Sequence, residues 1–155
     1  MKVTVLSSFD ARFFTQPSPW IHVAITDPAP GYHHPLNRCR HKADVLHLRF
    51  SDVTPRDFES NPAFKRFEAG LFDAGQAGQI VAFLDEHRNA GVDVMVNCEA
   101  GISRSAAVAN FVLEYFGSKQ APFAPPHYHP NPYVLEVLRE VAARRRSGEP
   151  APVGG

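Results

Sequence analysis

Cysteine is scarce in this chain: of 155 residues, two are cysteines, Cys39 and Cys98. Two cysteines without a repeating pattern give no disulfide framework. Three histidines lie near Cys39, but their spacing lacks the regularity of a metal-binding motif; they are His33, His34 and His41. We therefore interpret Cys39 as a free structural cysteine, with a role as resolving thiol for an oxidised Cys98 as the alternative.

Net charge and long apolar runs are also lacking. Sixteen basic and 16 acidic side chains cancel, so no overall field draws the chain to nucleic acid or to a membrane. The longest apolar runs are far shorter than the roughly 20 residues of a membrane-spanning helix, and residues 1–8 are too few for a secretory signal. We expect a soluble protein without nucleic-acid or membrane partners, and the shortage of cysteine favours the cytoplasm.

The order of the hydrophobic patterns predicts one α/β domain, residues 1–149, followed by a flexible tail at 150–155. An apolar content of 44% in 155 residues is enough for a single sizeable core. Strands are predicted at 2–6, 21–25, 45–50 and 92–96. Helices are predicted within 8–18, from 54, at 62–68, 73–89 and 104–116, and from 132 to about 146. This order favours a three-layer sandwich: a mostly parallel sheet of four or five strands with helices on both faces.

One stretch, residues 96–106, combines reactive side chains with a backbone suited to anions. It links a short buried strand to an apolar helix, so its turn lies at the carboxyl end of the strand and the amino end of the helix. There, backbone N–H groups lack partners and the helix dipole favours an anion. Arg104, six residues after Cys98, adds a planar fork of donors suited to a tetrahedral oxyanion. Such a cradle favours the thiolate form of Cys98.

The pattern Cys-x5-Arg-Ser resembles the signature of the protein tyrosine phosphatase superfamily, and Gly101 with the Ser-Arg-Ser run at 103–105 is most similar to the dual-specificity branch. The resemblance covers about residues 45–116, where strand, aspartate loop, helix, strand, signature and buried helix follow the family's order. It implies a phosphoric monoester hydrolase of the protein-tyrosine or dual-specificity type. Its substrate would be a phosphorylated protein or a small phosphomonoester, and no metal or organic cofactor is required.

The resemblance also implies a role for each residue of the motif. Cys98 would attack phosphorus and form a thiophosphoryl enzyme, which water then cleaves. Ser105 would hydrogen-bond the sulfur and ease its departure. Arg104 and the loop amides would hold the phosphate oxygens; these amides belong to Glu99, Ala100, Gly101, Ile102, Ser103 and Arg104.

The family takes its general acid from an aspartate in a loop after the strand upstream of the signature, and Asp52 occupies the matching place. Asp57 and Asp73 have structural explanations as helix-capping residues, so Asp52 is the least explained carboxylate. The interval of 46 residues from Asp52 to Cys98 is longer than the family's usual one, and the excess is the helical stretch at 62–68. An exposed loop aspartate without a catalytic role is the alternative.

Asn97 is a second departure, because the family has histidine before the nucleophile. Asparagine can hold the loop through hydrogen bonds but brings no imidazole, so we expect reduced turnover or a shifted pH optimum. Two other functions stay open. The first is a non-catalytic phosphate-binding module, which is favoured by Asn97 and by the long interval from Asp52 to Cys98. The second is a sulfurtransferase that carries a persulfide on Cys98, and this function explains the Gly and Ser-Arg-Ser pattern less well.

The substrate and two surface segments stay open as well. Phosphotyrosine, phosphoserine and phosphothreonine all fit the motif. Glu99, and the lack of lysine in the loop, argue against a polyphosphorylated inositol or an RNA 5′-triphosphate. The basic segment 37–42 and the segment 127–129 are each interpreted as solvated surface, with contact at the rim of the site as the alternative.

Overall fold

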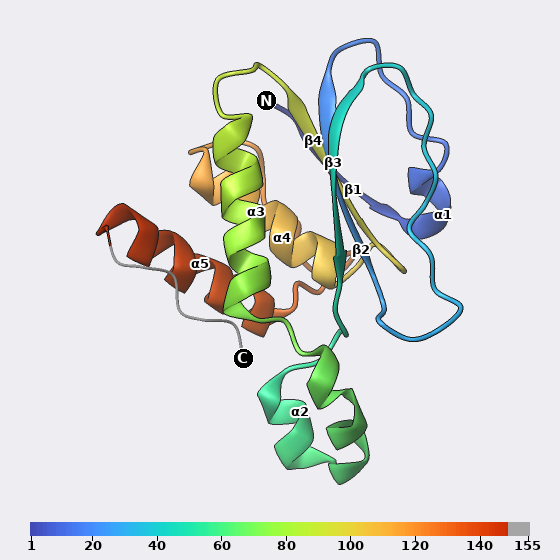
Figure 1. Cartoon of the computed structure of the whole chain (residues 1–155), viewed down its shortest axis with the longest axis vertical. Coiled ribbons are helices and arrows are strands. Elements are labelled where there is room, and N and C mark those ends of the chain that lie inside the picture. The colour runs from blue at the N-terminus through green and yellow to red at the C-terminus, as the bar shows by residue number, and fades with distance from the viewer. Residues whose placement is uncertain (149–155) are drawn as a thin grey trace.

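The computed structural model describes residues 1–148 and contains one sheet of four parallel strands (Figure 1). The strands are β1 (Val3–Ser7), β2 (Trp20–Thr26), β3 (Lys42–Arg49) and β4 (Asp93–Cys98), and their order across the sheet is β1-β4-β2-β3. Every neighbouring pair runs parallel, with Val5 opposite Val96 and Val23 opposite the same residue from the other side. All seven residues of β2 are buried, as expected for a parallel strand covered on both faces.

Three helices cover one face of the sheet: α3 (Ala74–Glu86), α4 (Arg104–Tyr115) and α5 (Pro132–Arg146). Figure 1 shows them together on one side. The main core lies beneath them, and it includes Val23, Ile25, Ile80, Leu84, Val96, Val108, Val112 and Leu138. The α/β sandwich expected from the sequence is therefore confirmed.

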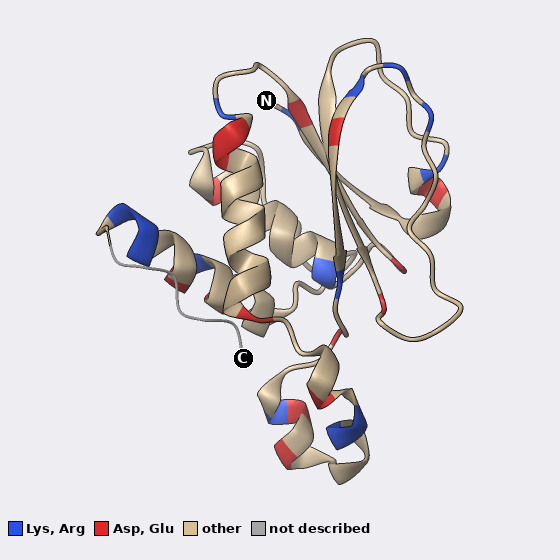
Figure 2. Cartoon of the chain, in the orientation of Figure 1, with Lys and Arg blue, Asp and Glu red and all other residues tan. Residues whose placement is uncertain are grey.

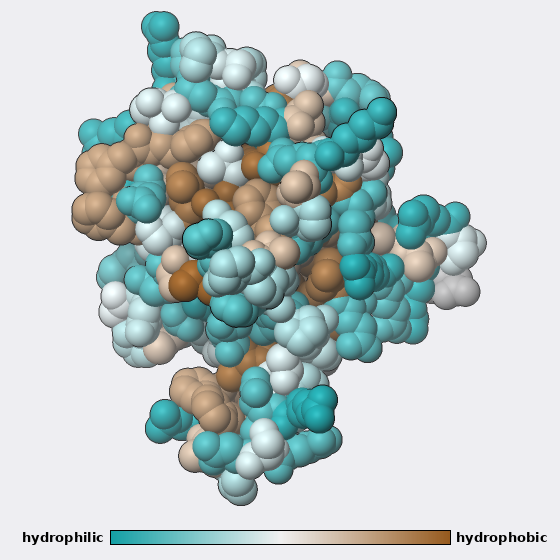
Figure 3. All heavy atoms as spheres, turned by 180° about the vertical axis from the view of Figure 1, so that it is seen from behind, coloured by the Kyte–Doolittle hydropathy of each residue, from teal (hydrophilic) through white to brown (hydrophobic). Residues whose placement is uncertain are grey.

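In the part of the chain that the structure describes, the other face carries α1 (Ser8–Ala11) and the irregular segment that joins β2 to β3. A smaller apolar cluster of Ala11, Trp20 and Met95 lies there, and Asn37 fixes the segment by donating hydrogen bonds to the carbonyls of Ala11 and Phe14 at 2.8 and 2.9 Å. The helix predicted within 8–18 is only four residues long, and Phe14, beyond its end, packs against Trp20. Figure 3, a view from behind, shows apolar atoms gathered at the left edge, on the α1 side.

Local capping signals place the helix starts as predicted. Thr54 and Asp57 form a capping box at α2 (Pro55–Ser60), and Asp73 and Gln76 form one at α3. Asn131 caps α5, with its Oδ1 accepting from the N–H groups of residues 133 and 134. The stretch predicted at 62–68 is the 3₁₀ helix η1 (Pro62–Gly70), which extends with α2 away from the sheet in Figure 1. The helix predicted to reach residue 89 ends three residues earlier, before a turn that leads to Gly91 at φ +65°.

Charged residues are distributed over the elements, with basic groups on the segment before β3 and at the end of α5 (Figure 2). Arg144 and Arg145 form ion pairs with Glu140 and Asp85, which supports a structural interpretation of that helix end. No helix within residues 1–148 is long and apolar enough to span a bilayer. The tail predicted at 150–155 lies outside the described residues.

Candidate active site

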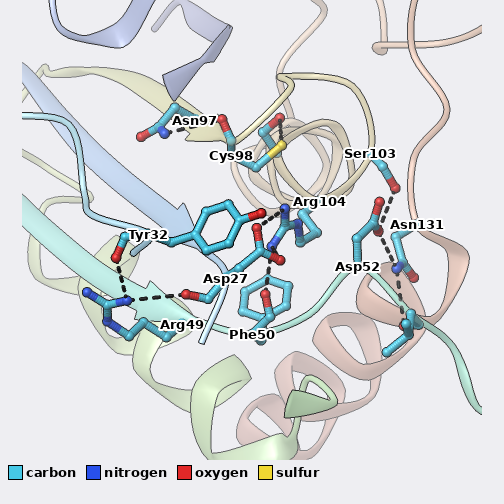
Figure 4. Close-up of polar contacts among 12 residues, drawn as sticks. Asp27, Tyr32, Arg49, Phe50, Asp52, Asn97, Cys98, Ser103, Arg104 and Asn131 are labelled. Carbon is cyan, nitrogen blue, oxygen red and sulfur yellow. Dashed lines mark hydrogen bonds and ion pairs between the residues drawn. The ribbon is translucent and has the colours of Figure 1, made fainter. Parts of the chain in front are cut away.

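The segment from Cys98 to Ser105 joins β4 to α4 and brings the reactive side chains of the motif together (Figure 4). Cys98 is the last residue of β4 and is 2% exposed. Arg104 is the first residue of α4 and is 5% exposed. The turn between them lies at the carboxyl edge of a parallel sheet, which is where ligands bind in open α/β folds.

The backbone of this turn has its carbonyl groups bonded away from the loop. The Glu99 carbonyl accepts from the N–H of Ser8 at 3.1 Å, and the Ile102 carbonyl accepts from the N–H of His129 at 3.0 Å. The Ser103 carbonyl accepts from the N–H of Asn131 at 3.2 Å. No N–H from residues 99 to 104 donates to another group within residues 1–148. These six donors, at the start of a 12-residue helix, are therefore available to an anion.

Gly101 is the residue that the loop geometry requires to be glycine. Its φ is +71°, in the left-handed region, and a Cβ built on it would lie 2.5 Å from the backbone nitrogen of Ser7 and 2.8 Å from the carbonyl oxygen of Leu6. Any side chain would push the loop away from the end of β1. Backbone conformation and close packing therefore select glycine here together.

We expect Gly101→Ala to lower the free energy of unfolding by about 3 kcal/mol or more, because left-handed strain adds to overpacking. Gly117→Ala is a matched control: Gly117 has a φ of +63°, but nothing lies within 4 Å of its Cβ position. That variant should lose only about 1 kcal/mol. Urea denaturation measures both values. Equal losses in the two variants would mean that Gly101 is not confined by the end of β1.

Ser105 lies beside the sulfur of Cys98. Its Oγ is 3.0 Å from the Cys98 Sγ, and both side chains are buried. A hydroxyl at this distance can donate a hydrogen bond to a thiolate. The structure thus brings together the pair that the sequence placed seven residues apart.

Arg104 is held by two groups at the carboxyl edge of the sheet (Figure 4). Its Nη1 donates to Asp27 Oδ1 at 3.2 Å and to the Phe50 carbonyl at 2.7 Å, and its Nη2 donates to Asp27 Oδ2 at 3.4 Å. Nε is buried without a partner among the described residues. A guanidinium has five N–H donors, so Nε–H and the second N–H of Nη2 remain, and they lie on one edge of the group. That edge is a two-donor fork suited to two oxygens of an oxyanion.

Asp52 lies in the loop after β3, next to the signature. Its Oδ1 accepts hydrogen bonds from Ser103 Oγ and Asn131 Nδ2, both at 2.9 Å, while Oδ2 has no partner within residues 1–148. The side chain is exposed, so one carboxylate oxygen is fixed and the other is open to solvent. Asp57 is occupied in its capping box, as the sequence predicted.

Asn97 is fully buried and pairs with a histidine of the neighbouring strand. Asn97 Oδ1 lies 2.7 Å from His22 Nε2, and Asn97 Nδ2 donates to the Cys98 carbonyl at 3.4 Å. Burial lowers the pKa of His22 to about 4. The ring is therefore neutral at pH 7, with Nε2 as the donor to the amide oxygen. This pair orients Asn97 so that its NH₂ group faces the start of the loop.

The remaining sequence candidates lie around this site or away from it. Cys39 packs beside the Trp20 cluster, on the face of the sheet opposite the core that contains Cys98. His34 stacks on His47, with ring centroids 4.4 Å apart. In the segment 127–129, His127 and His129 are exposed while Tyr128 is half-buried against the core, and the segment reaches the site through the bond from the His129 N–H to the Ile102 carbonyl.

One group of potential metal ligands occurs within residues 1–148: Asp44, Glu86 and His87. It lies at the start of β3, away from the carboxyl edge, and it already contains a 2.8 Å contact between His87 Nε2 and Asp44 Oδ2. The contact between His87 and Asp44 explains why these two side chains lie together without a metal ion.

Sequence reasoning missed Asp27 and Asn131 as parts of the site. Asp27 follows β2 directly, as Asp52 closely follows β3 and the loop follows β4. The carboxyl ends of parallel strands meet at one edge of the sheet. The position of Asp27 directly after a strand could therefore have indicated that it belongs to the site. Asn131 directly precedes the helix predicted from residue 132 and caps it, but its second function as a donor to Asp52 gave no local signal.

Comparison with solved structures shows that the chain has a dual-specificity-phosphatase-like fold. Human DUSP28 is 17% identical, with 95% of each chain covered and a TM-score of 0.56. A human tyrosine phosphatase-like serine/threonine/tyrosine-interacting protein is 20% identical over 83% of this chain and 80% of its own, with a TM-score of 0.50. A mouse protein named as a dual specificity phosphatase, complexed with zinc tungstate, is 16% identical over 86% of this chain and 76% of its own, with a TM-score of 0.50.

No protein-family model matches the sequence, and no curated protein matches it significantly. The similarity to solved structures confirms the fold that the sequence resemblance implied. At identities of 16–20% it concerns the fold alone.

Proposed function

We propose that this protein is a cysteine-dependent phosphatase that hydrolyses phosphate monoesters through a thiophosphoryl-enzyme intermediate. Phosphotyrosine is the first candidate substrate, followed by phosphoserine and phosphothreonine. Two observations carry the proposal: the buried Arg104 keeps its Nε–H and one Nη2–H without partners, and the six amides of residues 99–104, which follow Cys98 directly, donate to no group within residues 1–148. A buried cation edge and a ring of free donors are costly unless an anion binds there.

In the first proposed step, the Cys98 thiolate attacks phosphorus in line with the leaving oxygen. The S–P bond forms, the P–O bond breaks, and Asp52 gives its proton to the departing alkoxide or phenoxide. The amides of residues 99–104 and the Arg104 fork hold the other three oxygens, where negative charge accumulates. Asp27 and the Phe50 carbonyl keep the guanidinium in place without using its free edge.

In the second step, water attacks phosphorus and the S–P bond breaks. Asp52, now a carboxylate, takes the proton of the water, and Ser105 stabilises the leaving thiolate through its 3.0 Å contact with Sγ. Inorganic phosphate is released and the enzyme returns to its starting state. The sequence of steps requires no metal or cofactor, and it requires a reduced thiol, which favours a reducing compartment such as the cytoplasm.

The direct test is to capture the intermediate. The protein is mixed with p-nitrophenyl phosphate, quenched in acid within milliseconds, and digested for mass spectrometry. The peptide that contains Cys98 should carry one phosphoryl group, and the peptide that contains Cys39 should not. Hydrolysis without any phosphocysteine would overturn the proposed mechanism.

We expect Asp52→Asn to lower kcat about 100-fold for phenyl phosphate, because proton transfer to the leaving group typically contributes at least that factor. The loss should be smaller for p-nitrophenyl phosphate, whose leaving group is a weaker base and needs less protonation. The basic limb of the pH profile of kcat should disappear, because it reports the deprotonation of the acid.

Asp57→Asn is the matched control for Asp52→Asn. Asp57 caps α2 and accepts from the Thr54 N–H at 2.7 Å, so its replacement affects helix stability and leaves hydrolysis unchanged. Equal rates of hydrolysis for the two variants would mean that Asp52 is an exposed loop residue without a catalytic role.

A non-catalytic phosphate-binding module is the second candidate, supported by the buried Asn97 where the family has histidine. One structural neighbour carries "phosphatase-like" and "interacting protein" in its name, and another was crystallised with tungstate, a tetrahedral oxyanion. Phosphate binding without turnover in the native protein would favour this candidate. A sulfurtransferase would instead form thiocyanate from thiosulfate and cyanide.

A further inference from the structure

A hollow of about 540 Å³ opens beside the signature loop. Its lining comes from three places: α1, the segment between β2 and β3, and Glu99 of the loop itself. Figure 4 shows the ring of Tyr32 turned toward Arg104. Tyr32 lines this hollow and also a neighbouring one that contains Asp27, so it lies between the hollow and the Arg104 region.

Three large apolar side chains are exposed at or beside the hollow, whose lining also contains polar groups. Phe9 is 62% exposed, Phe13 is 66% exposed and Leu36 is 65% exposed. Phe9 and Leu36 line the hollow, and Phe13 stacks edge-on against Phe9 with ring centroids 5.4 Å apart. Exposed aromatic side chains that gather around a concavity are typical of a binding site.

Arg12 adds a positive charge to this surface. Its guanidinium lies 4.7 Å from the centroid of the Phe9 ring and 5.4 Å from that of Phe13. It forms no ion pair with any carboxylate in the described part of the chain. Cation-π contacts hold the group in place while its N–H donors stay open to a carboxylate from outside.

The surface is fixed to the candidate active site through hydrogen bonds. The Ser8 N–H, at the start of α1, donates to the carbonyl of Glu99 at 3.1 Å. Asn37 joins the other wall of the hollow to the end of α1 through its bond to the Ala11 carbonyl. A ligand that places its phosphate at the loop would therefore extend its neighbouring atoms over a preformed surface.

We propose that this surface, made of Phe9, Arg12, Phe13, Tyr32 and Leu36, binds the residues that flank the phosphorylated residue of a phosphoprotein substrate. The flanking segment carries an aromatic or large aliphatic side chain for the hollow and a carboxylate for Arg12. A small phosphometabolite would fill the loop but leave this area uncovered. The hollow is concave, which suits a peptide segment better than the flat surface of a bilayer. The proposal rests on the proposed function and deepens it to a substrate class.

The experiment compares three substrates: p-nitrophenyl phosphate, a phosphotyrosyl peptide flanked by Leu and Glu, and the same peptide with Ala and Gln in those places. For the native protein, the first peptide should have a kcat/KM about tenfold or more above the second. Phe9→Ala and Arg12→Gln should each remove most of that advantage. Hydrolysis of p-nitrophenyl phosphate should stay within about twofold, since neither side chain belongs to the catalytic machinery.

Phe64→Ala is the matched control, because Phe64 is an exposed phenylalanine of η1 outside the hollow. It should leave all three substrates unchanged, and thermal melting checks that every variant is folded. Equal kcat/KM values for both peptides in the native protein would overturn the proposal. So would a Phe9→Ala variant that loses binding to phosphatidylserine vesicles, or self-association in sedimentation, while peptide turnover stays the same.

Failure of the proposed function gives a different result. If the native protein hydrolyses none of the three substrates, binding of the two peptides is measured by calorimetry. Preference for the Leu-Glu peptide that is lost on Phe9→Ala would then support the docking surface on a non-catalytic module. Absence of any preference would overturn it independently of catalysis.

Discussion

Replacing Cys98 by serine should abolish hydrolysis of p-nitrophenyl phosphate, with kcat falling on the order of 10⁴-fold or more. A serine hydroxyl at this position has no adjacent base to activate it: the buried neighbour of the sulfur is Ser105, itself a hydroxyl, at 3.0 Å. The anion-binding groups are unchanged in this variant, because the amides of 99–104 and the Arg104 fork do not involve the sulfur. Binding of phosphate or vanadate, measured by calorimetry, should therefore persist.

Cys39→Ser is the matched control within the same chain. Cys39 lies on the other face of the sheet, beside Trp20 and Met95, so its replacement should leave both hydrolysis and anion binding unchanged. Retained activity in Cys98→Ser would exclude the sulfur as nucleophile. Loss of activity in Cys39→Ser after exposure to peroxide, but not before, would instead support the alternative role of Cys39 as a resolving thiol.

Features that depend on neighbouring residues could be predicted from the sequence. The capping boxes at Thr54 and Asp73 and the cap at Asn131 all depend on a few consecutive residues. The same holds for the pair of Cys98 and Ser105, since one short loop fixes both. Local hydrogen-bonding rules carry this information directly.

Contacts between distant strands could not be predicted in this way. Asp27 and Arg104 are 77 residues apart, and His22 and Asn97 are 75 apart. Both pairs form because β2 lies beside β4 in the strand order β1-β4-β2-β3, which the hydrophobic pattern does not specify. Asp27 therefore had no sequence signal of its own for this pairing, although it determines which edge of the Arg104 guanidinium stays free.

The length of α1 shows how tertiary contacts change a local pattern. Phe9, Phe13 and Phe14 have helical spacing, but the helix stops at Ala11. Phe14 packs against Trp20, with the ring centroids 4.8 Å apart, while Phe9 and Phe13 stay exposed. An amphipathic helix would have buried the three rings on one face. The observed division leaves two of them available at the surface beside the signature loop.

Arg104→Lys should lower kcat/KM for p-nitrophenyl phosphate by about 10³-fold, although the positive charge is kept. The ammonium group is a point charge on a flexible chain, and it has no planar fork. It has three N–H donors, whereas the native guanidinium donates to Asp27 and the Phe50 carbonyl and still offers two N–H groups to the anion. Lysine therefore satisfies either the protein acceptors or the phosphate oxygens, but not both.

The loss should appear in kcat as well as in KM, because a fork aligned with the equatorial oxygens stabilises the transition state more than the ground state. Stability should fall by about 1–3 kcal/mol, since the Phe50 carbonyl loses a buried donor. Arg139→Lys is the control: Arg139 pairs with Glu114 on an exposed surface of α5 and α4, so its replacement should leave kcat/KM unchanged. An Arg104→Lys variant that is folded and within tenfold of native activity would show that phosphate is not held by this edge of the guanidinium.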